Sequence, residues 1–291
     1  MKPAAFAYHR PDDVSEAVAL LADLGEGAKV LAGGQSLVPM MALRLAVFDD
    51  LVDVGRVAEL RGIERRNGDL WIGAGTTQAT IERSADVAEA APLLARATPL
   101  IGHFQIRNRG TIGGSIAHAD PAAEYPAVAL ALDATLEATS TRGVRTIPVA
   151  DLFTGLWTTA LEADELLTGV RLPVWSGRCG FAVEEFARRH GDFAIAGAAV
   201  AVELGDDDRI RRCAIALLGL GSTPIRPTRA EAEVTGAAVA NIDADGLAHD
   251  IVAGLGSIPS DLHGSAAYRA RVGAAVVARA WTAATSEALD G

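Results

Sequence analysis

The chain has 291 residues, half of them hydrophobic, which is enough to bury one large or two ordinary domains. Twenty-six basic against 37 acidic residues give a formal net charge of −11, which argues against nucleic acid or an anionic membrane as a partner. No uncharged apolar run is long enough to cross a bilayer and no export signal is recognisable at the start. We therefore expect a cytoplasmic protein without an integral membrane segment. Cys179 and Cys213 are the only cysteines, too few for an iron–sulfur cluster or a disulfide framework.

The first part of the chain alternates short apolar runs with amphipathic stretches, which predicts mixed α and β structure. Helical spacing of apolar residues predicts a helix over 13–24 that ends at Gly25. A short strand over 29–32 then leads into Gly33-Gly34. After these glycines, Ser36 is expected to cap a helix whose apolar residues extend to Leu45.

Further elements follow in the order strand, hairpin, helices, hairpin and strand. Their predicted ranges are 51–54, 62–75 with a turn at Asn67-Gly68-Asp69, 78–97, a helix from Pro121 to about 132, 134–149 and 166–172. The stretch 173–178 is a candidate domain junction. Beyond it, strands over 181–189, 196–204 and 210–220 predict an antiparallel sheet, with helices starting at 228, 243 and 265.

Two glycine-rich segments carry the clearest chemical signal. The first glycine loop is Ala32-Gly33-Gly34-Gln35-Ser36, and the second glycine loop is Thr111-Ile112-Gly113-Gly114-Ser115. Glycine lets backbone amides approach a diphosphate without a Cβ in the way, and a following helix favours negative charge at its N-terminus. Either loop alone could be a tight connection between elements. Because the chemistry occurs twice, we predict that the loops hold a dinucleotide from both sides.

Neither loop is a standard nucleotide-binding fingerprint. A Rossmann motif needs Gly-x-Gly-x-x-Gly after a strand, with an acidic residue farther on, and Gly73-Ala74-Gly75 lacks the third glycine. A P-loop needs Gly-Lys-Ser/Thr, which does not occur.

Three long motifs carry a family resemblance. They are the segments 31–40, 105–124 and 188–194, the last reading Arg-Arg-His-Gly-Asp-Phe-Ala. In this order they resemble the FAD-binding medium subunit of the molybdenum hydroxylases, the carbon monoxide dehydrogenase and xanthine dehydrogenase family. The resemblance implies an α+β fold. Residues 1–176 would form an FAD-binding domain of the vanillyl-alcohol-oxidase/p-cresol-methylhydroxylase type with two α/β subdomains, and 177–291 a three-stranded antiparallel sheet with helices.

The same resemblance implies where FAD would bind. The backbone of both glycine loops would hold the pyrophosphate, Ile101 would make a hydrophobic contact, Glu124 would hydrogen-bond the cofactor, and Phe193 would lie near the isoalloxazine ring. The full implied cofactor-binding set is Leu31, Ala32, Gly33, Gly34, Gln35, Ser36, Leu37, Ile101, Thr111, Ile112, Gly113, Gly114, Ser115, Asp120, Glu124, Asp192 and Phe193. No catalytic residue and no metal ligand is assigned. In animal members of this family a basic residue stands near the position of Glu185. Because this chain has an acidic residue instead, the resemblance assigns no cofactor contact to Glu185.

The function implied by the resemblance is electron transfer through non-covalent FAD. A large subunit would carry the molybdenum cofactor and a small subunit two [2Fe–2S] clusters, with the whole assembled as a dimer of heterotrimers. Any association with the inner face of the membrane would come through that complex. The substrate, whether carbon monoxide, a purine, an N-heterocycle or an aldehyde, stays open. The alternative is a self-sufficient FAD-dependent oxidase or dehydrogenase that acts on a small molecule.

Other polar residues near the second glycine loop allow several interpretations. His118 and Asp120 form a His-x-Asp pair, but two ligands are a weak metal signal. Asp120 is instead expected to cap the helix beginning at Pro121. Arg107 and Arg109 either neutralise phosphate or face solvent or a partner subunit, and no Ser-His-Asp or Cys-His arrangement can be assembled.

Overall fold

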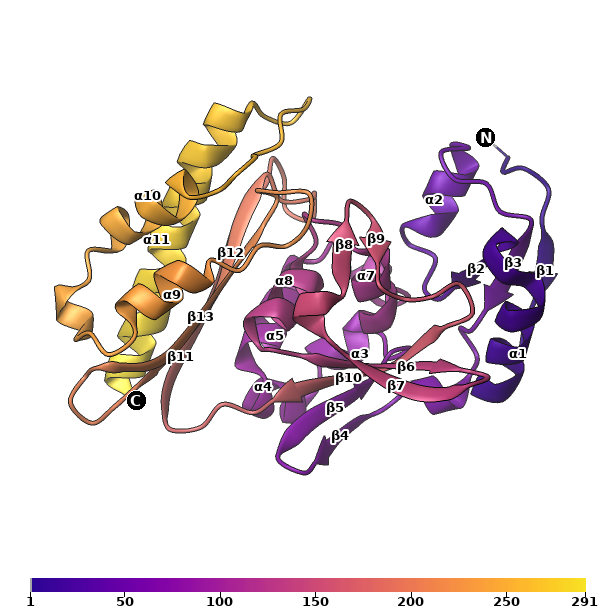
Figure 1. Ribbon diagram of the computed structural model, residues 1–291, viewed down its shortest axis with the longest axis horizontal. Helices are drawn as coiled ribbons and strands as arrows, with labels where there is room; N and C mark the ends of the chain where they lie inside the picture. The colour runs from indigo at the N-terminus through magenta and orange to yellow at the C-terminus, as the bar shows by residue number, and fades with distance from the viewer. Residues whose placement is uncertain (1) are drawn as a thin grey trace.

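The computed structural model describes residues 2–291 and places two α/β subdomains beside a C-terminal sheet that is covered by helices (Figure 1). The first subdomain contains a parallel three-stranded sheet in the order β1-β3-β2. Its strands are β1 (Ala7–His9), β2 (Ala28–Leu31) and β3 (Asp50–Asp53), and its helices are α1 (Val14–Leu24) and α2 (Leu37–Ala42).

Helix α1 has the ends that its sequence predicts. The Asp13 side chain accepts a hydrogen bond from the amide of Glu16 at 2.8 Å, and Gly25 follows the last turn with a φ of 63°. The buried residues Ala17, Val18 and Leu21 pack with Val52 of β3 in a small core. This packing holds the sheet that leads into the first glycine loop.

The second subdomain is built on an antiparallel five-stranded sheet in the order β4-β5-β10-β6-β7. The strands are β4 (Ile63–Arg66), β5 (Asp69–Gly73), β6 (Thr135–Ser140), β7 (Gly143–Pro148) and β10 (Leu166–Pro173). Its helices are α3 (Gln78–Glu82), α4 (Ala85–Ala90), α5 (Pro92–Ala97), α6 (Phe104–Arg107), α7 (Ile112–His118) and α8 (Glu124–Ala131). A separate small hairpin joins β8 (Phe153–Gly155) to β9 (Thr158–Thr159). The β4–β5 turn has positive φ at Asn67 and Gly68, as that dipeptide predicts.

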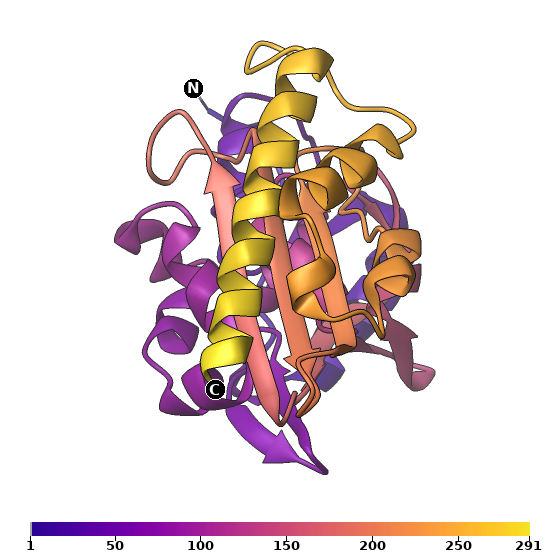
Figure 2. The same cartoon turned by 90° about the vertical axis from the view of Figure 1, so that its left-hand side faces the viewer.

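The C-terminal part is an antiparallel sheet of β11 (Arg178–Phe186), β12 (Ala196–Leu204) and β13 (Ile210–Leu218). Helices α9 (Thr228–Val234), α10 (Ala244–Ala253) and α11 (Ala266–Asp290) cover its outer face, with α11 lying along the strands (Figure 2). The chain also has short 3-10 helices at Gly25–Gly27, Ala58–Leu60, Thr98–Leu100, Val149–Asp151 and Val239–Asn241.

Both faces of this C-terminal sheet are buried. Alternate residues such as Ala199 and Ala201 join the core of the second subdomain, whereas Ala198, Val200 and Val202 pack toward the covering helices. The alternation follows from the two-residue period of a strand. An Arg96–Glu287 ion pair at 2.5 Å adds a polar link between α5 and α11. Within residues 2–291, no helix combines the length and apolar character needed to cross a bilayer.

Four local predictions are wrong. Ser36 makes no side-chain capping hydrogen bond, and α2 ends at Ala42, before Arg44 with its φ of 58°, so Leu45 lies outside the helix. The helix predicted to start at Pro121 begins instead at Glu124. The Asp120 side chain does not cap it, because it accepts from the nearby amide of Ala122 at 2.9 Å and closes a turn. The second glycine loop, for which no helix or strand is predicted, forms the N-cap and first turn of α7.

Candidate functional site

The first glycine loop presents free backbone donors. It follows β2 directly and leads into α2 at Leu37, and all residues from Leu31 to Leu37 are half-buried. Within the described chain, the amides of Gly33, Gly34, Gln35 and Ser36 donate to no protein acceptor, while the carbonyls of Gly34 and Ser36 accept from the following helix. Gly34 has a φ of 73°, which favours glycine. This run of unpaired amides fits an anionic group such as a diphosphate.

The first glycine loop packs against the two residues that lead into the second. A Cβ added to Gly33 would lie 2.1 Å from the backbone oxygen of Arg109 and 2.8 Å from the Cα of Gly110. Only glycine allows this approach, because real Cβ atoms do not come so close to backbone atoms. The structure therefore brings together the two segments that the sequence places far apart.

The second glycine loop is held by hydrogen bonds within the protein. The amide of Ile112 donates to Thr76 and that of Gly113 to Ala74, at 3.2 and 2.8 Å. The Thr111 hydroxyl caps α7 by accepting from the amide of Gly114 at 3.0 Å. The Ser115 amide donates to the carbonyl of Thr111 at 3.1 Å. The amides from Ile112 to Ser115 are thus already engaged, so this loop offers a helix N-terminus and side chains rather than free donors.

Glycine in the second loop is required by packing. A Cβ on Gly113 would lie 2.5 Å from the Cβ of Ala74 and 2.7 Å from its carbonyl oxygen. Gly114 has more room, because the nearest atoms to an added Cβ are the Thr111 hydroxyl at 2.8 Å and the Ala32 Cβ at 3.5 Å. Ala32 belongs to the first glycine loop, so the two loops lie side by side at this point.

A pair of acidic side chains lies past α7. Glu124, at the start of α8, is buried, and that burial, reinforced by the charge of Glu185, raises its pKa to about 8. Burial raises the pKa of Glu185 on β11 to about 7. The Oε2 atom of Glu185 is buried without a hydrogen-bond partner within residues 2–291. A buried carboxyl with spare hydrogen-bonding capacity fits a polar ligand edge.

A third group of side chains surrounds the end of α7. Asp120 Oδ2 lies 3.9 Å from His118 Nε2 and accepts from Trp157 Nε1 at 3.3 Å. Burial lowers the pKa of His118, which favours the neutral imidazole. No cluster of three or more His, Cys, Asp or Glu side chains suited to a metal ion occurs in the described part of the chain. The sequence analysis does not single out Trp157. The one signal in the sequence is that this large aromatic residue stands in a short run of mostly small and polar residues.

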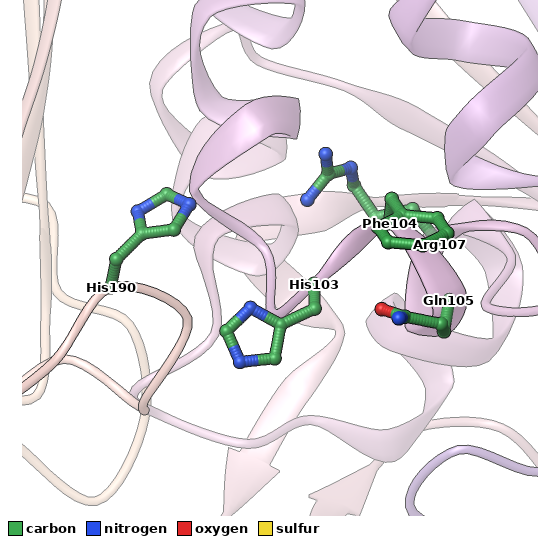
Figure 3. Close-up of a pocket in the computed structure, with 5 residues that line it drawn as sticks. All are labelled: His103, Phe104, Gln105, Arg107 and His190. Atoms are coloured by element: carbon green, nitrogen blue, oxygen red, sulfur yellow. The ribbon is translucent and has the colours of Figure 1, made fainter.

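Ile101 and Phe193 lie on two segments that also contact each other. A Cβ on Gly191 would lie 2.8 Å from the backbone oxygen of Gly102, so the turn between β11 and β12 packs against the segment after Ile101. Phe193 is 64% exposed, and Asp192 is exposed beside it. Next to this contact is an open pocket of about 420 Å³. It is lined by His103, Phe104, Gln105, Arg107 and His190, and the two imidazoles approach it from opposite segments (Figure 3).

Arg107 serves the fold rather than a phosphate. Its guanidinium is buried and donates to both carboxylate oxygens of Glu82, at 2.9 and 3.0 Å. It also donates to the backbone oxygens of Ile101 and Gly102. Arg107 therefore shapes the segment that leads to the second glycine loop. Arg109 is exposed, and its backbone, not its charge, meets Gly33.

Comparison with known proteins covers the chain nearly end to end. A family model described as the FAD binding domain in molybdopterin dehydrogenase matches residues 4–175, and one described as the CO dehydrogenase flavoprotein C-terminal domain matches 181–284. The chain is 44% identical to the 6-hydroxypseudooxynicotine dehydrogenase complex subunit alpha of Paenarthrobacter nicotinovorans, over 94% of this chain and 92% of the relative. It is 39% identical to the carbon monoxide dehydrogenase medium chain of Hydrogenophaga pseudoflava, over 98% of each.

The fold agrees with these relatives. A chain in the solved carbon monoxide dehydrogenase from Hydrogenophaga pseudoflava superposes with a TM-score of 0.95 at 39% identity, covering 99% of both chains. A chain of quinoline 2-oxidoreductase from Pseudomonas putida 86 superposes with a TM-score of 0.92 at 35% identity, covering 99% of this chain and all of the other. The expected FAD-binding domain and C-terminal domain are both confirmed. The chain belongs to the family of FAD-binding medium subunits of molybdenum-containing dehydrogenases, like those of carbon monoxide dehydrogenase.

Proposed function

We propose that this chain is the flavoprotein electron-transfer subunit of a molybdenum hydroxylase. It takes electrons from [2Fe–2S] clusters of a small partner subunit onto non-covalent FAD and passes them to an external acceptor. A large partner subunit carries the molybdenum cofactor and oxidises the substrate. The observation that carries the proposal is the run of unpaired amides in the first glycine loop, in a chain of this family.

The residues of this chain bind and orient the cofactor. The amides from Gly33 to Ser36 hold the pyrophosphate, and the N-terminus of α7 adds a favourable dipole beside it. Glu124, kept mostly protonated near neutral pH, donates a hydrogen bond to a polar group of the flavin. FAD itself supplies the redox chemistry, since it accepts single electrons and can release two. No general base on this chain is required.

The remaining predicted contacts belong to the same proposal. Ile101 and Phe193 meet the isoalloxazine ring from the two segments that Gly102 and Gly191 bring together. Asp120 and Asp192 contribute polar contacts, and Leu31 and Leu37 flank the first glycine loop. We place the complex in the cytoplasm as a dimer of heterotrimers, and the FAD-binding domain within 1–176.

Purification of the chain tests this proposal. We expect a yellow protein that releases its flavin on acid precipitation and that co-purifies, when expressed from its native host, with one much larger and one smaller chain. A folded chain that cannot be reconstituted with FAD would overturn the flavin assignment.

The alternative is a self-sufficient FAD-dependent oxidase. It would be active without partner chains, and on a related fold it would often tether FAD covalently. Flavin that stays with the acid-precipitated protein, together with substrate oxidation by the isolated chain, would favour it over electron transfer.

A further inference from the structure

The tip of the β8–β9 hairpin displays an aromatic residue in an unusual way. Trp157 has a φ of 54° and is 54% exposed. A left-handed backbone is uncommon for a bulky residue and costs free energy unless its surroundings hold it. Exposure of a large indole also loses the benefit of burial. Both costs are typical of a residue positioned for a ligand.

The indole is held by two contacts and still leaves about half of the residue exposed. Its ring is nearly parallel to that of His118, with centroids 6.4 Å apart and an interplanar angle of 9°. Its Nε1–H donates to Asp120 Oδ2 at 3.3 Å. These two contacts fix the ring plane and leave the remaining exposed surface available for a flat partner.

The position of the indole along α7 suits the flavin end of FAD. The second glycine loop forms the N-terminus of α7, and His118 is the last residue of that helix. At a rise of about 1.5 Å per residue, the helix separates these ends by about 9 Å. The ribityl chain separates the pyrophosphate from the isoalloxazine ring by a comparable length. Glu124, the proposed flavin partner, begins the next helix.

We infer that Trp157 stacks the exposed part of its indole on the isoalloxazine ring of FAD, with His118 and Asp120 fixing the plane of the indole. The inference rests on the proposed FAD-binding function and adds a residue to that site. Trp157 acts by contact with the ring, so it should affect how the ring is held more than how the pyrophosphate is held.

Titration of the full-length chain with FAD tests the inference, with wild type compared with Trp157→Ala and Trp157→Phe. Loss of one aromatic stacking contact is worth up to about a tenfold change in dissociation constant. We expect about that loss for Trp157→Ala and partial recovery for Trp157→Phe. Because a stacked indole quenches flavin emission, bound FAD should also fluoresce more strongly in both variants. Leu156→Ala, at the neighbouring exposed tip position, should behave like wild type.

Titration with ADP distinguishes the two ends of the cofactor. Stacking on isoalloxazine leaves the affinity for ADP unchanged in Trp157→Ala, whereas an equal loss for ADP and FAD would overturn it in favour of adenine. Unchanged FAD affinity and fluorescence in a Trp157→Ala variant with wild-type circular dichroism would also overturn the inference but leave the proposed function standing. A folded wild-type chain that binds no FAD would overturn both.

Discussion

In the first glycine loop the backbone amides from Gly33 to Ser36 have no hydrogen-bond partner within the described chain. In the second, the amides donate to the carbonyls of Thr76 and Ala74 and to the hydroxyl of Thr111. The sequences are alike, with paired glycines followed by a polar residue, but the first pair precedes α2 whereas the second pair lies in the first turn of α7. Their glycines are nevertheless required for different reasons. Gly33 allows the first loop to pack against the backbone of Arg109, and Gly113 allows α7 to pack against Ala74. A glycine-rich motif can therefore mark either a ligand cradle or the tight packing that supports one.

Gly33→Val should have the largest effect, because it places atoms where the backbone of Arg109 and Gly110 already lies. We expect loss of FAD binding by at least about a hundredfold, as the free amides move with the loop. Flavin content per folded chain measures this. Gly256→Ala is the matched control, since no atom lies within 4 Å of its added Cβ. Full flavin content in Gly33→Val would show that the first loop is not the cradle.

Gly113→Ala should affect folding before binding. Its Cβ would overlap Ala74, and overpacking of this kind costs about 1–3 kcal/mol. We expect a lower melting temperature for the FAD-free variant, with flavin binding retained by the molecules that stay folded. If the melting temperature were unchanged and only the affinity for FAD fell, the second glycine loop would contact the cofactor rather than support the fold.

Glu124→Gln should change how the stability of the folded chain depends on pH. The pKa of Glu124 is raised in the folded chain, so its stabilising contribution is complete below its ordinary pKa of 4.5 and is lost as pH rises through about 8. The melting temperature of the FAD-free wild type should therefore fall as pH rises from about 4.5 to about 8, with Glu185, whose folded pKa is about 7, contributing in the same direction. In Glu124→Gln this decline should be shallower. Identical slopes would contradict the buried-carboxyl assignment.

Thr111→Val should have the smallest effect. It removes the hydroxyl that caps α7, which is worth about 1 kcal/mol. We expect a melting temperature a few degrees lower and little change in the affinity for FAD, measured by titration. Thr154→Val, at an exposed position on β8, provides the comparison for the substitution itself. A large loss of FAD affinity in Thr111→Val would show that this hydroxyl serves the cofactor directly.

Much of the fold follows from local patterns. The helix over α1, the Asn67-Gly68 hairpin and the three C-terminal strands are predicted from apolar spacing and turn residues because their neighbours reinforce the local preference. The start of α8 is not, because Asp120 satisfies a turn amide that competes with helix capping. Local sequence also predicts which glycine segments lie close together, since Gly33 packs against the residues before Thr111. It does not distinguish free amides from engaged ones, because Thr76 and Ala74 approach through tertiary packing.

The residues of the candidate site also fall into two groups, those that local sequence predicts and those that depend on tertiary packing. A motif singles out Glu124 and Asp120 as candidates. The raised pKa of Glu124, however, comes from its burial and then from Glu185, which β11 brings from the other part of the chain. Arg107 pairs with Glu82 and is therefore no longer a candidate phosphate ligand. The local sequence around neither residue predicts this pairing. Trp157 depends on a hairpin tip whose position is set by contacts with His118 and Asp120.

The C-terminal sheet, with alanines on one face packed into the core of the second subdomain, limits how this protein can move. A hinge between the two parts would have to separate closely packed surfaces and expose apolar area to water. The turn between β11 and β12, which carries Phe193, is thereby held at a fixed place beside the segment that follows Ile101.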